Sequence, residues 1–459
     1  MTVSGINFHV LDVGQGACNF VEILNEDGLV SHILLIDLGT VSTRKTAEDN
    51  IAWLREQIEN NDQYLDALIM THGDHDHYNL IAKILPAFGP PDGNQIGMVR
   101  YGGPDWRYAT GKLIRTLGRY TGDIGGFAPS QTGYDPDREE KWEPIWQTGT
   151  DIDDVFLQLI IADVPHPHDP ANLYAVRRPK MNGEAVNTKS VVMGLQWRDD
   201  WFVATGDATA TTLGAVTELL ELETDPLPAT LMMTMPHHGS RKTTYDLQKA
   251  NNIPGFEARM VVGEFLDLFT PSSVSISADD KNFHHPSLYL TEQFSTKLNP
   301  ATPPLWGDPE LAAGYHFLTS WIDLAITPVF LEPRWPANWL YGTTRTAANV
   351  FCTYYFSSRQ YNSENYGQYI APPLPSYPTQ DFEAQDDVPA GRNWQFSRDG
   401  HGFTVTSTPN PSHRVRAVAV AGGGAGGGAR SASPRSATTT AGRAIRAAVP
   451  LVSGRRRRQ

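Results

Sequence analysis

The residues best suited to chemistry lie in one short segment, THGDHDH, at positions 71–77. His72, Asp74 and Asp76 alternate along it, and His77 follows directly. Alternate side chains of an extended segment point to the same side, so the three can face one centre, toward which His77 can turn back. Imidazole nitrogens combined with carboxylate oxygens suit Zn²⁺, or Mn²⁺ and Fe²⁺ where carboxylates dominate. The segment therefore predicts a metal site.

A polar loop that caps the following helix is the alternative interpretation of this segment. This alternative is weak, because the segment contains no Lys or Arg. The carboxylates of Asp74 and Asp76 would repel one another unless a cation lay between them.

An apolar run, LDALIM at 65–70, leads into the segment. It predicts a buried strand, and a buried parallel strand delivers its C-terminal residues to a crevice where loops can carry a site. The chain around it alternates strands with helices. Strands are expected at 6–13, 18–23 and 32–37, a helix at 43–60 with Ser42 as its cap, and a short helix at 78–86.

A second alternating series follows residues 87–150, which are rich in Gly, Pro, Asp and Trp and are expected to be an irregular insertion. Its expected strands are 155–161, 189–197, 201–205, 230–235, 258–263 and 273–277, and its expected helices are 210–222 and 287–297. Residues 300–392 are expected to be a second insertion with few clean periods, apart from a strand at 345–356. A hairpin is expected at 394–408, around Asp399-Gly400.

The chain of 459 residues has 40% hydrophobic and 19% charged residues, which is a globular composition. No apolar run approaches the length needed to cross a bilayer, and the first residues read as a strand, not as a signal peptide. Two cysteines, Cys18 and Cys352, are too few for a disulfide framework. We therefore expect a cytoplasmic protein with no membrane partner.

Charge is distributed unevenly along the chain. The net charge is −14, but residues 412–459 carry ten arginines and no acidic residue, which leaves −24 on the remainder. Such an acidic body disfavours tight non-specific binding to nucleic acid. Residues 411–459 are rich in Gly, Ala and Arg and are expected to be a disordered tail. Its closing RRRR either contacts nucleic acid or acidic surfaces, or is solvated without a specific partner.

The spacing His-x-Asp-x-Asp-His resembles the metal-binding motif of the metallo-β-lactamase superfamily. The Asp in place of the second His resembles one branch, the hydrolase domain of bacterial DNA-uptake (competence) channel proteins and their soluble relatives. Further segments resemble that branch in the same order: FHVLDVGQG (8–16), LLIDLGT (34–40, with Asp37 at the usual acidic position), WFVATGDAT (201–209), MPHHGSRKT (235–243) and DDKNFHHPS (279–287). Ordered motifs are jointly specific.

The resemblance implies an αββα sandwich: two mixed sheets face to face, with helices outside and the site at one edge between the sheets. It implies one domain over residues 1–410. It also implies Zn²⁺, or alternatively Mn²⁺, as one or two ions. The expected metal ligands are His72, Asp74, Asp76, His77, Asp207 and His238.

Several of these residues have a plainer interpretation. Asp207 could cap the following helix, since Asp is a preferred N-cap. His237 is expected to support the site rather than to bind metal. His284 is expected at the surface, and His166 and His168 are expected to form a loop pair without a metal role.

Two departures from the family pattern stand out. The superfamily usually supplies another His to the first metal, but the corresponding stretch here holds Asn187, Lys189 and Ser190 and no His. Lys189 suits a phosphate oxygen better than a metal ion. Ala17 stands where the branch usually has an acid.

The expected activity is metal-dependent hydrolysis, most simply of a phosphodiester, with nucleic acid as one candidate substrate and a metal-activated hydroxide as the nucleophile. Asp76 would orient that nucleophile. His285 or His237, with Ser240 or Lys189, would stabilise developing charge or protonate the leaving oxygen. Hydrolysis of a small ester, lactone, thioester or amide is the second hypothesis, since fold does not fix substrate. A non-catalytic interaction protein is the third. The sequence identifies no protein partner.

Overall fold

The fold is taken from a computed structural model of the chain. It describes the following residues: 2–41, 45–137, 141–149, 151, 153–170, 173–174, 181, 183–221, 223, 226–248, 254–278, 285–302, 305, 349–353 and 391–410. Most of the expected insertion at 300–392, His284 and the tail at 411–459 lie outside these ranges. Among the helices so described, none combines the length and the apolar character that a membrane crossing requires.

The first sheet has eight strands and joins the two ends of the described fold. Its order is β15 (Gly402–Pro409), β14 (Arg392–Asp399), β1 (Val3–Val10), β2 (Cys18–Asn25), β3 (Val30–Leu38), β4 (Leu65–Met70), β5 (Ile96–Tyr101) and β6 (Ile124–Gly126). The pairs from β15 to β3 are antiparallel, and those from β3 to β6 are parallel.

Within the described ranges, the second sheet has seven strands and the same mixed character. Its order is β13 (Val350–Cys352), β12 (Val274–Ile276), β11 (Ala229–Thr234), β10 (Asp200–Ala204), β9 (Val192–Trp197), β8 (Val155–Ile161) and β7 (Pro144–Gln147). The pairs from β7 to β10 are antiparallel, and those from β10 to β13 are parallel.

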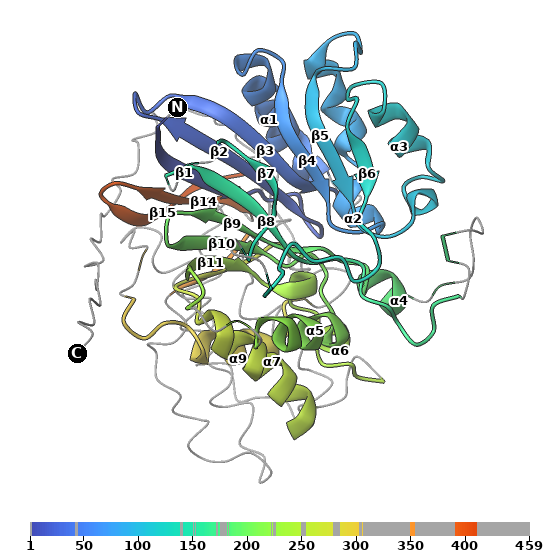
Figure 1. Cartoon of the computed structure of the whole chain (residues 1–459), viewed down its shortest axis with the longest axis vertical. Helices are drawn as coiled ribbons and strands as arrows, with labels where there is room; N and C mark the ends of the chain where they lie inside the picture. Colours follow the sequence, from blue (N-terminus) through green and yellow to red (C-terminus); the bar gives the residue numbers. More distant parts are fainter. Residues whose placement is uncertain are drawn as a thin grey trace, which may run out of the picture.

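Helices cover the outer faces of the two sheets (Figure 1). On the first sheet lie α1 (Glu48–Asn60) and α3 (Lys112–Leu117); on the second lie α5 (Ala210–Leu220), α7 (Phe256–Phe269) and α9 (Leu288–Thr296). The αββα sandwich of two mixed sheets expected from the sequence is confirmed.

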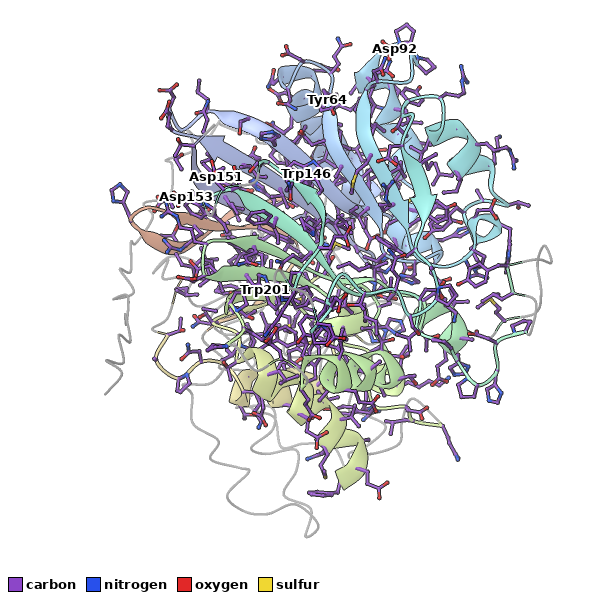
Figure 2. All side chains as sticks on the ribbon, in the orientation of Figure 1. Tyr64, Asp92, Trp146, Asp151, Asp153 and Trp201 are labelled. Carbon is purple, nitrogen blue, oxygen red and sulfur yellow. The ribbon has the colours of Figure 1, made fainter. Side chains whose placement is uncertain are left out.

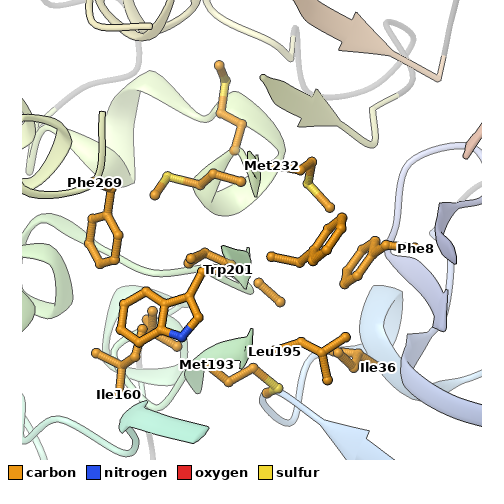
Figure 3. Close-up of a cluster of buried hydrophobic side chains, with 14 of the residues drawn as sticks. Phe8, Ile36, Ile160, Met193, Leu195, Trp201, Met232 and Phe269 are labelled. Atoms are coloured by element: carbon orange, nitrogen blue, oxygen red, sulfur yellow. The ribbon is translucent and has the colours of Figure 1, made fainter. Parts of the chain in front are cut away.

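Apolar side chains fill both faces of the second sheet (Figure 3). Successive residues of a strand point to opposite faces. Phe202 therefore points inward and stacks on Phe8 of the first sheet, with ring centroids 5.8 Å apart. Trp201 points outward toward Phe269 of α7, with centroids 6.2 Å apart. Trp146 of β7, labelled in Figure 2, also reaches the first sheet. Its ring centroid lies 5.6 Å from that of His32 in β3.

Three expectations about secondary structure were wrong. The expected strand at 258–263 is part of α7, because Val262, Phe265, Leu266 and Phe269 repeat at helical spacing and are buried on one face. The expected helix at 43–60 begins at Glu48, and its N-cap is Ala47, not Ser42. The expected helix at 78–86 is instead a series of short turns.

Residues 87–150 are also more regular than expected. They contribute β5 and β6 to one edge of the first sheet and β7 to one edge of the second. These strands are only three to six residues long and are difficult to recognise in the Gly- and Pro-rich sequence. Short strands of this kind give little periodic signal.

Candidate metal centre

The metal-site segment begins where β4 ends, at the carboxyl end of the parallel strands. Thr71 to Asp74 lead from the strand into α2 (His75–Tyr78). The end of β3 packs directly against this segment, and a side chain at Gly39 would have its Cβ 2.4 Å from the carbonyl carbon of Asp76. Glycine at this position therefore permits the close approach that the site needs.

Four side chains from three strand ends form one compact group: Asp76, His77, Asp207 and His238. One potential ligand atom from each lies within 4.8 Å of all the others. His77 Nε2 is 2.9 Å from Asp207 Oδ1, and His238 Nε2 is 3.4 Å from the same oxygen. His238 Nε2 is 3.6 Å from Asp76 Oδ2. Asp207 therefore faces ligands from both sheets.

The unsatisfied atoms of this group fit a metal ion. His72 Nε2, His77 Nε2, His238 Nε2 and Asp207 Oδ1 are buried. Among the described residues, none of these atoms has a partner in hydrogen-bonding geometry, and the 2.9 Å approach of His77 to Asp207 does not supply one. A buried polar atom without a partner is costly, so native structures rarely leave several together. Imidazole nitrogens and carboxylate oxygens that converge in this way are the donor set that Zn²⁺ or Mn²⁺ accepts.

Neighbouring groups hold the two metal-site histidines in orientation. Asp37 Oδ2 lies 2.8 Å from His77 Nδ1, and Thr71 donates to the same carboxylate from its amide and its hydroxyl, each at 2.7 Å. The Ser277 carbonyl lies 2.7 Å from His238 Nδ1. In each case the Nδ1 contact directs Nε2 toward the centre, as supporting hydrogen bonds do for metal-bound histidines.

The charged groups of the site shift one another's pKa values in a way that favours ionised carboxylates with positive charge beside them. Burial opposes ionisation of Asp207, but neighbouring His237, His77 and His238 hold its pKa well below the usual range. Burial likewise disfavours a charged His77, yet Asp207 and Asp37 raise its pKa well above the usual value. These shifts favour a positively charged His77 beside an ionised Asp207. A metal ion needs the neutral imidazole as its ligand, so it would compete with the proton of His77.

His72 and Asp74 lie at the margin of the compact group. His72 Nε2 is 3.6 Å from Asp207 Oδ2 and 3.9 Å from Asp74 Oδ2. Asp74 Oδ1 accepts a hydrogen bond of 2.6 Å from Arg107. With its amide oriented to satisfy its neighbours, Asn187 donates to Asp74 Oδ2 at 3.0 Å. Burial and Asp76 raise the pKa of Asp74 to about 6, against the influence of Arg107.

His237 and His285 meet beside the group, with ring centroids 5.9 Å apart. His237 Nε2 is 3.3 Å from Asp207 Oδ2. The loop that carries His237 has positive φ at both histidines, and Gly239 follows with φ +84°, where a Cβ would lie 2.5 Å from the Pro286 side chain. This packing brings the late His-Pro segment to the site.

Lys189 is engaged in a buried ion pair. Its Nζ contacts Asp169, lies 3.4 Å from Asp163 Oδ1 and donates to the Val164 carbonyl at 2.9 Å. These partners already balance the charge of Lys189. The expected contact of Lys189 with phosphate stays a prediction.

The structure also places two other residues that the sequence singled out. Thr209, not Asp207, caps α5, since its side chain accepts from the Thr212 amide. Ala17 lines a small hollow beside the group, together with Asn19 and Ser277. An acid at position 17 would extend into this hollow.

Sequence reasoning missed Arg107 and Ser277. Neither belongs to a motif, and each reaches the site through a loop packed against it. All of the expected ligands, His72, Asp74, Asp76, His77, Asp207 and His238, lie at or beside the group, whereas the expected role of each in binding metal stays a prediction.

Together the fold and the site define a class: an αββα sandwich with a candidate His/Asp metal site at the carboxyl ends of its strands. No protein-family model and no curated protein match the chain. Among solved structures, it is similar to a variant of the CmlA beta-hydroxylase (13% identity, TM-score 0.32), with 63% of this chain matched to 51% of the other. It is also similar to a long form RNase Z from yeast (11% identity, TM-score 0.32), with 62% of this chain matched to 38% of the other. The matched part thus spans about half or less of each of these proteins, and TM-scores this low carry no argument about function.

Proposed function

We propose that the chain is a metal-dependent hydrolase, and more narrowly a phosphodiesterase of the metallo-β-lactamase superfamily. The observation that carries the proposal is the compact group of Asp76, His77, Asp207 and His238. In the described part of the chain, the ligand atoms of the last three are buried without a hydrogen-bond partner. The resemblance of the sequence to the competence-type branch supports phosphodiester bonds as the target.

A bound divalent ion would supply an acidified water and polarise a phosphoryl oxygen. Asp76, His77, Asp207 and His238 would hold it, while Asp37 keeps the proton of His77 on Nδ1, away from the centre. Zn²⁺ is the ion we propose first, with Mn²⁺ as the alternative.

His237 and His285 supply the proton-handling groups beside the centre. Their rings are adjacent, and burial, together with His237 and His238, lowers the pKa of His285 well below its usual value. A neutral imidazole near the reacting atoms can accept a proton and then donate it to a leaving oxygen.

A second candidate is hydrolysis of a small ester, lactone, thioester or amide. The net charge of −14 favours it, because an acidic protein repels polyanions such as nucleic acid.

For the phosphodiesterase, we propose nucleic acid as one candidate substrate and the cytoplasm as the location. Within the described residues, the buried Cys18 and Cys352 form no disulfide, which agrees with a reducing compartment.

The test is metal content, paired with hydrolysis of bis-(p-nitrophenyl) phosphate and of a lactone reporter. The variant Asp76→Ala/His77→Ala should lose both metal and activity. The matched control is His75→Ala, a histidine of the same segment that is exposed and lies outside the group; it should retain both.

Each outcome separates the hypotheses. Bound metal with phosphodiester hydrolysis that only the double variant loses would support the proposal. Bound metal with lactone hydrolysis alone would move the assignment to the second candidate. If no ion bound even after reconstitution, the catalytic proposal would be wrong.

A further inference from the structure

A fixed positive charge lies beside the proposed metal centre. Arg107 Nη2 is 2.6 Å from Asp74 Oδ1, and the two side chains are 27% and 30% exposed. Arg107 belongs to the 3-10 turn η4 (Asp105–Arg107), which follows β5.

The structure holds Arg107 firmly against the metal-site segment. The Tyr78 hydroxyl donates to the Arg107 carbonyl at 3.0 Å and accepts from the Ala109 amide at 3.0 Å. Gly73 makes room for the arginine side chain, since a Cβ at Gly73 would lie 2.4 Å from Arg107 Cβ. Residue 107 is thus positioned by contacts to both ends of the segment.

Both oxygens of Asp74 are engaged. Arg107 contacts one, and Asn187 donates to the other. Asp74 is also absent from the group of four whose ligand atoms converge within 4.8 Å. A carboxylate already neutralised by a guanidinium is a poorer ligand for a second ion, and a divalent ion next to the guanidinium would be repelled by it.

We propose that Arg107 takes the place of a second metal ion. This inference rests on the proposed function and deepens it: the centre holds one ion, and the guanidinium binds a non-bridging oxygen of the phosphodiester. Asp74 then serves as a positioning residue for Arg107. The guanidinium has five N–H donors in a planar fork that matches phosphate oxygens, and its partial exposure leaves it open to a substrate.

The competing explanation is that Arg107 merely orients Asp74 as a ligand of a two-ion centre, since metal-binding carboxylates are usually hydrogen-bonded. His72 faces the same space with its buried Nε2. The two explanations predict different ion counts and different phosphate affinities.

The first experiment counts Mn²⁺ ions per chain at saturation, by equilibrium dialysis and elemental analysis. Wild type should bind one ion, and Asp74→Asn should also bind one. Two ions in wild type, with one lost in Asp74→Asn, would overturn the inference while leaving the proposed function intact. Binding of no ion in any form would overturn the proposed function and this inference together.

The second experiment measures the affinity of the Mn²⁺-loaded protein for inorganic phosphate by calorimetry. Losing one charge-assisted contact should weaken phosphate binding by about 10- to 100-fold in Arg107→Gln. Arg107→Lys keeps the positive charge but lacks the planar fork of donors. Its phosphate affinity should lie between those of wild type and Arg107→Gln. The matched control is Arg100→Gln, which breaks an Arg–Asp pair of the same region, with Asp123, and should leave affinity unchanged.

Unchanged phosphate affinity in Arg107→Gln would contradict the inference. Circular dichroism and thermal unfolding of each variant would show whether the fold is retained. If Arg107→Gln does not fold, the test rests on Arg107→Lys. A phosphate affinity of this variant equal to that of wild type would contradict the proposed binding of phosphate by the guanidinium fork.

Discussion

Replacing Asp37 by Asn tests how the fold prepares His77 to bind a metal ion. The Asp37 carboxylate is buried and receives two hydrogen bonds from Thr71, and it also contacts His77 Nδ1. Asn offers only one acceptor oxygen. If that oxygen still accepts the hydrogen bond from the Thr71 amide, the N–H₂ group of the introduced Asn faces His77 Nδ1. Nδ1 must then act as an acceptor, so the ring proton moves to Nε2, the atom that points toward the centre.

The expected consequence is weaker metal binding with the fold preserved. Loss of a group that orients a metal-binding histidine costs roughly 10- to 100-fold in affinity, or about 1.4–2.8 kcal/mol. The backbone should tolerate the change, because Asp37 has φ +62° and Asn adopts this conformation readily. Competition titration of Zn²⁺ or Mn²⁺ against a chromophoric chelator measures the effect.

The control for this substitution is Asp66→Asn, at the opposite end of the same strands. Asp66 accepts from the Ile33 amide at 2.8 Å and lies 4.0 Å from His32, so it has similar partners far from the centre. Its metal affinity should match that of wild type. Equal affinities of wild type and a folded Asp37→Asn variant would refute the reasoning.

Three further predictions concern stability. Burial raises the pKa of Asp163 to about 6 despite Lys189. The protonated Asp163 carboxyl therefore stabilises the folded state below pH 4, and this contribution of about 3 kcal/mol is lost as pH rises through 6. Between pH 4 and pH 7, the free energies of unfolding of wild type and Asp163→Asn, measured by denaturant titration, should diverge by this amount. Parallel pH dependences of the two proteins would contradict the prediction. Lys189→Met should lower the free energy of unfolding by about 3–5 kcal/mol, because it leaves Asp163 and Asp169 without their cation; a loss below 1 kcal/mol would show that the pair is dispensable. Phe8→Ala should cost about 3–5 kcal/mol, since the ring is fully buried against Phe202, whereas a small loss in a urea titration would mean that the sandwich collapses around the cavity.

The strands could be read from the sequence where their apolar runs are continuous. The run at 65–70 matches β4, and 155–161 matches β8. The run at 258–263 was misread because two adjacent valines suggest a strand, and only the longer window to Phe269 shows the helical period.

The site could be anticipated in part, for a different reason. Strand ends meet at one edge of a sheet, so motif residues that follow β4, β10 and β11 had to lie near one another. Contacts from loops carry no such constraint. Nothing in the sequence indicates that Arg107 reaches Asp74, or that Lys189 forms ion pairs with Asp163 and Asp169.

The pairing of β1 with β14 has a consequence for how the protein is made. Asn7 and Ser397 contact one another although they lie 390 positions apart. At typical rates of synthesis, roughly 20–80 s pass between the synthesis of β1 and that of β14. During this time, the edge of β1 that pairs with β14 is uncovered. An uncovered strand edge invites pairing with other chains, so β1 is open to such pairing during this interval. Deleting the hairpin of β14 and β15 would make the exposed edge permanent.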